Sequence, residues 1–119
     1  MIIKRAVSGK SICEYTFSGE IDISAIRSFF NVILDEACSE KARGIIVDVS
    51  GLEGSMGIME TFSVVSSMEP FRDCGIKVAA VFGDKISELD EFGITVAKNR
   101  CIPYRRFKER AAAVEWINE

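Results

Sequence analysis

The chain has 119 residues, of which 48% are hydrophobic and 28% charged, and its formal net charge is −3 at pH 7. This length suits one domain around one core, and this balance excludes a disordered or fibrous protein. Basic and acidic residues are mixed along the chain, so no broad positive field is expected that would bind the phosphates of a nucleic acid.

The first half of the chain predicts a hairpin, a helix and a central strand. Residues 1–7 and 12–17 are rich in β-formers and flank the turn residues 8–10. A helix is predicted over residues 24–39, because apolar side chains recur there at the spacing of one helical face: Ile26, Phe29, Phe30, Ile33 and Ala37. Asp22 and Ser24 are its candidate N-caps. The apolar run 44–49 then predicts a strand covered on both faces.

The second half continues the alternation of helices and strands. A glycine-bearing loop at residues 51–57 precedes a helix whose inward face is predicted to hold Ile58, Phe62, Val65 and Met68. The remaining predicted elements are a strand at 77–82, a helix marked by Ile86, Leu89, Phe92 and Val96, a strand at 102–107 that carries Pro103, and a helix at 109–117. Pro103 indicates an edge strand or the first residue of one.

This order of elements predicts an α/β fold over residues 1–119, taken as a single domain. A mixed, mostly parallel sheet of about five strands is expected, with about four helices, and the opening hairpin supplies the antiparallel strand. No apolar segment is long enough to span a bilayer and the N-terminus shows no signal region, so the chain is expected in the cytoplasm.

Three segments resemble STAS domains of the anti-anti-sigma-factor type. They are residues 17–22 (Phe-Ser-Gly-Glu-Ile-Asp), 45–50 (Ile-Ile-Val-Asp-Val-Ser) and 54–57 (Gly-Ser-Met-Gly). The tail, residues 99–117, is similar to the divergent STAS-like branch that is also likened to CRAL-TRIO lipid-binding domains. The resemblance implies the STAS fold over nearly the whole chain and a regulatory role exercised through a protein partner.

The resemblance also implies a site in the loop after the central strand. Ser55 and Gly57 stand where switch members of the family carry a phosphorylated hydroxyl and a glycine, whereas Gly54 replaces the acid and Met56 the second hydroxyl. A phosphate on Ser55 would lie near the N-terminus of the next helix. The alternative, which we favour, is that Ser55 is simply the N-cap of that helix. The candidate partner or ligand loop comprises Asp48, Ser50, Gly54, Ser55, Met56 and Gly57.

Metal and cofactor chemistry finds little support in the sequence. There is no histidine, and the four cysteines are too dispersed for a C-x-x-C pair, so we expect buried free thiols. Asp22, Asp48 and Asp84 each adjoin a predicted strand and could gather around Mg²⁺, but each is also a plausible cap or turn residue, and we favour that interpretation. No metal site and no cofactor is therefore predicted.

A basic cluster near the C-terminus is the second candidate site. Arg100, Arg105 and Arg106 could contact an anionic head group, although the alternation of a strand would split them and a charged sheet edge explains most of the pattern. The methionines Met56, Met59 and Met68, with Phe62, fit a soft binding patch or ordinary core packing.

Catalytic motifs are absent from the sequence, so no enzymatic activity is predicted. The first hypothesis is a STAS-like regulatory domain that binds another protein through loop 51–57 and the following helix. The second is a domain that binds a lipid, a nucleotide or another small anion beside the second and third helices. A phospho-switch through Ser55 and a homodimer formed by a sheet edge or helix face stay open.

Overall fold

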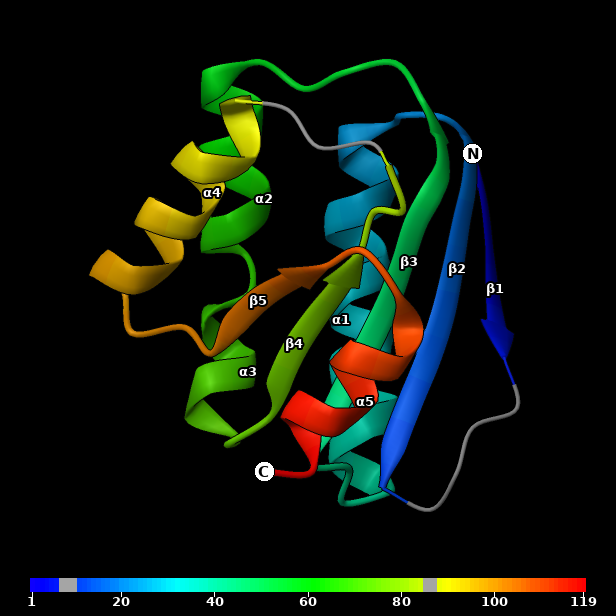
Figure 1. Cartoon of the computed structure of the whole chain (residues 1–119), viewed down its shortest axis with the longest axis vertical. Coiled ribbons are helices and arrows are strands. Elements are labelled where there is room, and N and C mark those ends of the chain that lie inside the picture. The colour runs from blue at the N-terminus through cyan, green and yellow to red at the C-terminus, as the bar shows by residue number, and fades with distance from the viewer. Residues whose placement is uncertain (7–10, 85–87) are drawn as a thin grey trace.

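The structure is a computed structural model of the chain that describes residues 1–6, 11–84 and 88–119 (Figure 1). Its strands are β1 (Ile2–Ala6), β2 (Ile12–Glu20), β3 (Gly44–Glu53), β4 (Lys77–Val81) and β5 (Tyr104–Phe107). Its helices are α1 (Ile23–Ser39), α2 (Ile58–Ser66), α3 (Glu69–Asp73), α4 (Glu88–Asn99) and α5 (Arg110–Ile117). The predicted turn at residues 8–10 and the predicted helical residue Ile86 lie outside the described residues.

The five strands form one sheet in the order β1-β2-β3-β4-β5. β1 pairs with β2 in the antiparallel sense, and every following pair is parallel. The predicted α/β fold with a mixed, mostly parallel sheet is thus confirmed. β5 is an edge strand that begins directly after Pro103, which agrees with the position predicted for this proline.

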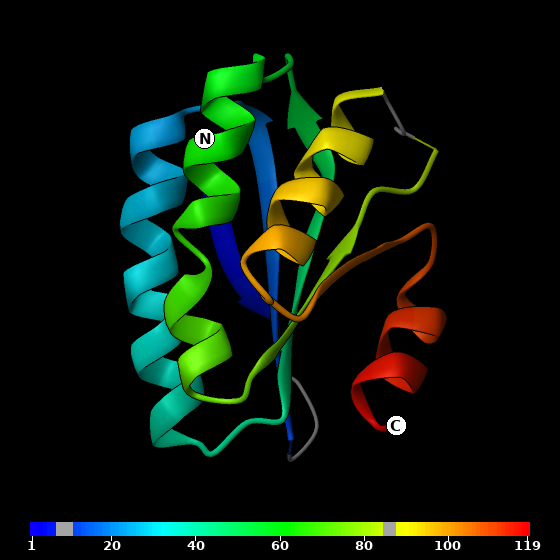
Figure 2. The same cartoon turned by 90° about the vertical axis from the view of Figure 1, so that its left-hand side faces the viewer.

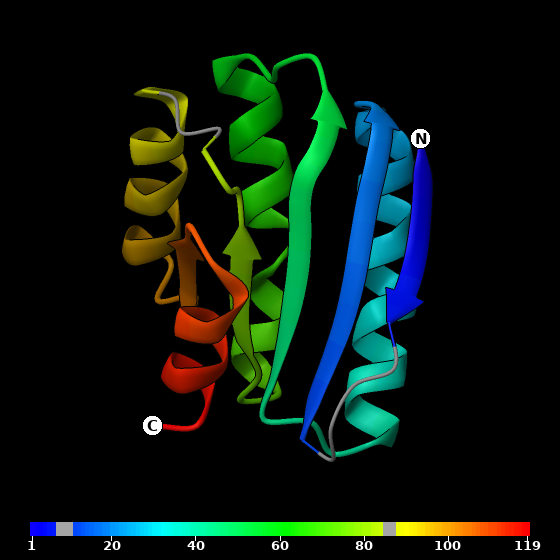
Figure 3. The same ribbon diagram turned by 45° about the vertical axis from the view of Figure 1, so that its right-hand side comes forward.

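Helices cover the two faces of the sheet unequally. Figure 2 shows α1, α2, α3 and α4 on one face and α5 alone on the other. The larger core lies under the four helices and includes Phe17, Phe30, Ile33, Val47, Val65 and Phe71. The smaller core lies under α5 and consists of Ile46, Ala79, Val81, Ala113 and Ile117. Consecutive strand residues alternate between these cores, because successive side chains of a strand point to opposite faces. Figure 3 shows α5 in front of the sheet and α1 behind it.

Helix α1 spans nearly the predicted residues and begins as predicted. The carboxylate of Asp22 accepts a hydrogen bond from the backbone N–H of Ala25 at 3.1 Å, so Asp22 is the N-cap. Four of the five predicted inward residues are buried, but Phe29 is exposed. Phe29 is 37% exposed, because it lies beside the buried stripe of Ile26, Phe30 and Ile33 that faces the sheet.

A buried acid connects the beginning and the end of the sequence. Glu14 of β2 points to the α5 face, where only 7% of its surface is exposed. Its carboxylate accepts two hydrogen bonds from the guanidinium of Arg110 in α5, one of them 2.7 Å long, across 96 positions of sequence. The paired oxygens explain how a carboxylate can be buried on this face.

Helix α3 is not among the elements predicted from the sequence, since a proline usually interrupts a helix. Pro70 instead lies in the first turn of α3, where its missing N–H has no helical partner to lose. Within the described ranges, the helices are too short or too polar to cross a lipid bilayer.

Candidate functional site

The candidate loop begins at the carboxyl end of β3, where the structure brings Asp48 and Ser50 together. The carboxylate of Asp48 accepts hydrogen bonds from the backbone N–H of Ser50 at 3.0 Å and from its hydroxyl at 2.6 Å. Both bonds are local, and they stabilise the backbone where β3 continues toward the surface. Asp48 therefore has a local structural role, in keeping with the cap or turn role expected from the sequence.

The loop is shorter than predicted because β3 extends to Glu53. Gly51 pairs with Ser18 and Leu52 pairs with Gly19, so the first three residues of the predicted loop are strand. Gly51 allows a close approach of β3 to β2, since a Cβ atom at this position would lie only 3.2 Å from the Cβ of Ser18. The true connection runs over residues 54–57, and Gly54 turns it with a φ of +96°.

Ser55 is not the N-cap of the following helix, so the capping role that the sequence favoured is wrong. Helix α2 begins at Ile58 with Gly57 as its N-cap. The carboxylate of Glu60 accepts a hydrogen bond from the Gly57 N–H at 3.0 Å and fixes the first turn in place of a serine. The side chain of Ser55 is left exposed at the tip of the connection.

Large apolar side chains are exposed at the start of α2. Ile58, Met59 and Phe62, which we call the α2 patch, expose 59%, 77% and 38% of their surface. The inward face of the helix is formed instead by buried Thr61, Val64 and Val65. The predicted inward positions of Ile58 and Phe62 are therefore wrong, whereas those of Val65 and Met68 are right.

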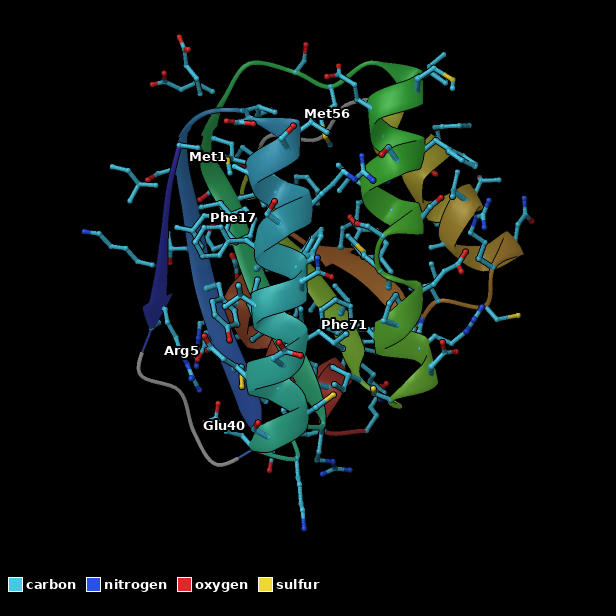
Figure 4. The ribbon with its side chains drawn as sticks, turned by 180° about the vertical axis from the view of Figure 1, so that it is seen from behind. Met1, Arg5, Phe17, Glu40, Met56 and Phe71 are labelled. Atoms are coloured by element: carbon cyan, nitrogen blue, oxygen red, sulfur yellow. The ribbon has the colours of Figure 1, made fainter. Side chains whose placement is uncertain are left out.

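An apolar cavity of about 350 Å³ lies between the sheet and α1, α2 and α4. Its walls include Phe17, Phe30, Val47, Val65, Met68 and Ala80. Gly54, Ser55 and Met56 border it at the surface, and Figure 4 shows Met56 between the N-terminal ends of α1 and α2. Among the described residues, no acidic or basic side chain lines this cavity.

The basic residues of the C-terminal part do not form one site. The guanidinium of Arg100 lies 2.5 Å from the Glu69 carboxylate and over the ring of Phe62, and Arg106 pairs with Glu91 of α4. Arg105 lies on the other face of β5, against the ring of Trp116. The expected split by strand alternation is thus present.

The three aspartates Asp22, Asp48 and Asp84 each have a different partner and do not form one site. Asp22 caps α1, Asp48 binds Ser50, and exposed Asp84 forms an ion pair with Lys108 at 3.0 Å. In the part of the chain that the structure describes, no three acidic or cysteine side chains gather closely enough to hold a metal ion.

The cysteines differ from the prediction of buried thiols. Cys13 is buried, but Cys38, Cys74 and Cys101 are exposed. Cys38 lies in the last turn of α1 and Cys74 ends α3. Each has hydrophobic neighbours in the sequence, but its own side chain points away from the core.

Comparison with known structures shows which fold this is. The structure is similar to that of an anti-sigma factor antagonist from Mycobacterium paratuberculosis, with a TM-score of 0.55, 15% sequence identity, and coverage of 99% of this chain and 96% of that one. It is also similar to the anti-sigma factor antagonist SpoIIAA in its unphosphorylated form, with a TM-score of 0.53, 12% identity, and coverage of 98% and 96%. The chain thus has a STAS-like fold over nearly its whole length. No family model and no curated protein sequence matches it.

Proposed function

We propose that this chain is a non-enzymatic regulatory domain that binds another protein through the α2 patch and the adjoining connection 54–57. The observation that carries the proposal is the exposure of Ile58, Met59 and Phe62 in the first five residues of one helix. Contiguous apolar side chains of this size at the surface of a protein mark binding sites, and methionine and phenylalanine are enriched in protein interfaces.

The similar structures support a protein as the partner. Both are named as antagonists of anti-sigma factors, which are themselves proteins. The α2 patch adjoins the connection that follows β3, at the carboxyl end of a parallel strand, where open α/β sheets usually carry their binding sites. A partner would bury the patch in an apolar groove of its own and would contact Ser55 at the rim.

The test compares two surface variants in capture experiments with lysate of the natural host. Ile58→Gln combined with Met59→Gln removes most of the patch, and Val32→Gln is the matched control, because Val32 is an exposed apolar residue of α1. The partner should be retained by the wild type and by the control. Binding of that purified partner should weaken at least about tenfold in the double variant, a loss of about 1.4 kcal/mol.

Thermal unfolding supplies the necessary control, since all three proteins should unfold at nearly the same temperature. A partner that binds the double variant and the wild type equally well would refute the proposed surface. A dimer in the wild type that dissociates in the double variant would show that the patch binds a second copy of this chain instead.

The phosphorylation of Ser55 is a further role proposed for the same connection. Its exposed hydroxyl is accessible to a kinase, and a phosphate would add negative charge beside the α2 patch. Peptide mapping of the protein purified from its host should locate the phosphate on Ser55, and Ser55→Asp should weaken binding of the partner. A chain that is unmodified under every growth condition would argue against this role.

A small-molecule binding domain is the second candidate function, and the apolar cavity favours it. Protein interiors rarely leave voids larger than a water molecule, whereas ligand pockets begin at about 300 Å³. The walls carry no charge among the described residues, so the buried part of a ligand would be an acyl chain or another apolar group. Any polar head would lie at the surface near Ser55.

Native mass spectrometry of the protein from its host tests this candidate directly. A ligand should appear as an additional mass that is lost on denaturation. Ala80→Leu would fill the cavity from β4 and should abolish this mass, whereas Ala112→Leu on the exposed side of α5 should retain it. Retention by Ala80→Leu would place the ligand elsewhere.

A further inference from the structure

Two exposed cysteines, one at the end of α1 and one at the end of α3, are in contact on the helical side of the sheet that covers the larger core. The thiol of Cys38, in the last turn of α1, donates a hydrogen bond to the sulfur of Cys74, which ends α3. The two Sγ atoms are 3.3 Å apart, although 36 positions separate the residues in sequence. Both side chains are exposed to solvent.

The surrounding packing holds the two sulfur atoms in place. One position before Cys38, Ala37 is fully buried, and three positions before Cys74, Phe71 is 1% exposed. The Phe71 ring contacts the Phe30 ring of α1 edge to face, with 6.1 Å between the ring centroids. Figure 4 shows Phe71 lying between α3 and α1. The helix ends that carry the thiols are thus fixed by core side chains.

We propose that Cys38 and Cys74 form a disulfide site, which is oxidised by low-molecular-weight disulfides of the glutathione type. One protein thiolate attacks a sulfur of oxidised glutathione and releases one glutathione thiolate, leaving a mixed disulfide. The second protein thiolate then attacks the protein sulfur of that mixed disulfide and releases the second glutathione. The protein loses two protons and two electrons, and one molecule of oxidised glutathione becomes two of reduced glutathione.

The short distance between the two Sγ atoms favours the second step, in which the mixed disulfide is resolved into the internal one. A disulfide requires about 2.05 Å between its sulfur atoms, so the thiols must approach by only about 1.2 Å. The hydrogen bond to Cys74 raises the pKa of Cys38 above its ordinary value. Because the thiolate is the reactive species, the exchange should accelerate as the pH rises above about 7.

The other two cysteines provide contrast within the same chain. Cys13 is buried beside Arg5 and Glu40, and burial raises the pKa of its thiol. Cys101 is exposed, but it follows α4, and none of its described contacts is with another thiol. We therefore expect the internal link to join Cys38 to Cys74 and to omit both of these residues.

A disulfide between Cys38 and Cys74 would restrain the separation of α1 from the α2–α3 segment. A polar groove runs between α1 and the α2–α3 segment, bordered by Arg27, Asn31, Ser67, Glu69 and Asp73. A bond from the end of α1 to the end of α3 would prevent these helices from separating at that end of the groove. The oxidised protein should therefore unfold at a higher temperature than the reduced protein.

The experiment equilibrates the folded chain at about pH 8 with glutathione buffers of increasing oxidised fraction, blocks remaining thiols with N-ethylmaleimide and measures the intact mass. The expected product carries two blocking groups fewer than the reduced protein and no glutathione, and peptide mapping should find Cys38 linked to Cys74. Cys101→Ser should give the same product. Cys38→Ser and Cys74→Ser should give only mixed disulfides.

Two controls keep the result independent of folding. Each reduced variant is checked by thermal unfolding, and the wild type is also equilibrated in denaturing urea, where the internal link should fall at least about tenfold because the thiols are no longer held together. Mixed disulfides alone in the folded wild type, a link that includes Cys101, or links between chains would overturn the proposal.

Discussion

At the scale of single residues, the hydroxyl of Tyr15 connects β2 to α1 inside the larger core. It donates a hydrogen bond to the carboxylate of Glu36 at 2.8 Å. Arg5 of β1 binds the same carboxylate at 2.8 Å and that of Glu40 at 2.5 Å, and Figure 4 shows Arg5 and Glu40 pointing toward each other. Burial, followed by the hydrogen bond to Glu36, raises the pKa of Tyr15 well above its usual range.

The contribution of this hydroxyl to stability should depend on pH in a defined direction. The unfolded tyrosine ionises near pH 10, whereas the folded one stays protonated, so the contribution is complete below about pH 10 and is lost as the pH rises above it. We expect Tyr15→Phe to lower the free energy of unfolding by about 1 kcal/mol at neutral pH. Urea unfolding should show this difference narrowing above about pH 10, and a constant difference would contradict the assignment.

The sequence could predict only those residue roles that depend on near neighbours. Asp22 was recognisable as a cap because an N-cap is a local pattern three residues long. The bonds of Tyr15 to Glu36 and of Glu14 to Arg110 were not predictable, since they depend on how separate elements are placed in space. The same holds for the contact of Cys38 with Cys74.

At the scale of elements, α1 forms the wall of the cavity beside β2 and β3, so its N-terminus affects both stability and the candidate site. Ile26 and Phe30 of this helix line the cavity, and the N-cap Asp22 lies about one turn before Ile26. The cap satisfies a backbone N–H that would otherwise lack a partner.

Replacing Asp22 by alanine should lower the free energy of unfolding by about 1 kcal/mol, because the Ala25 N–H loses its acceptor. Asp22→Asn keeps an oxygen at the same position and should recover most of this loss. Chemical denaturation of the three proteins checks the expectation. Equal losses in both variants would mean that the charge, and not the cap, is what stabilises the helix.

Hydrophobic periodicity predicted the order of the elements but failed at two points that define the site. Gly51 resembled a loop residue, yet its lack of a side chain lets β3 approach Ser18 and continue to Glu53. In α2 the polar residue Thr61 is buried while Ile58 is exposed, so a ranking by hydrophobicity selected the wrong face. In both places packing against another element decided what local preference could not.

At the scale of the whole molecule, the beginning of β3 packs closely against the end of α5 because Gly44 has no side chain. A Cβ atom on Gly44 would lie 2.8 Å from Cγ2 of Ile117, a side chain that is 1% exposed in the smaller core. The close approach lets α5 lie directly on the sheet.

Gly44→Ala should therefore displace α5 and lower the free energy of unfolding by about 1 to 3 kcal/mol. Adding Ile117→Ala makes room for the new methyl group, so the double variant should lose less than the sum of the two single losses. A double-mutant cycle from urea unfolding measures this coupling. Strictly additive losses would show that Gly44 and Ile117 do not constrain each other.

The order of the strands bears on how the chain can fold during its synthesis. Each strand of the sheet lies beside the strand that immediately precedes it in the sequence. A strand that leaves the ribosome therefore finds its partner already present, and the described strands can assemble from the first to the last without insertion between paired neighbours. Glu14 departs from this local order, because its carboxylate pairs with Arg110, which is synthesised 96 residues later and completes the face under α5.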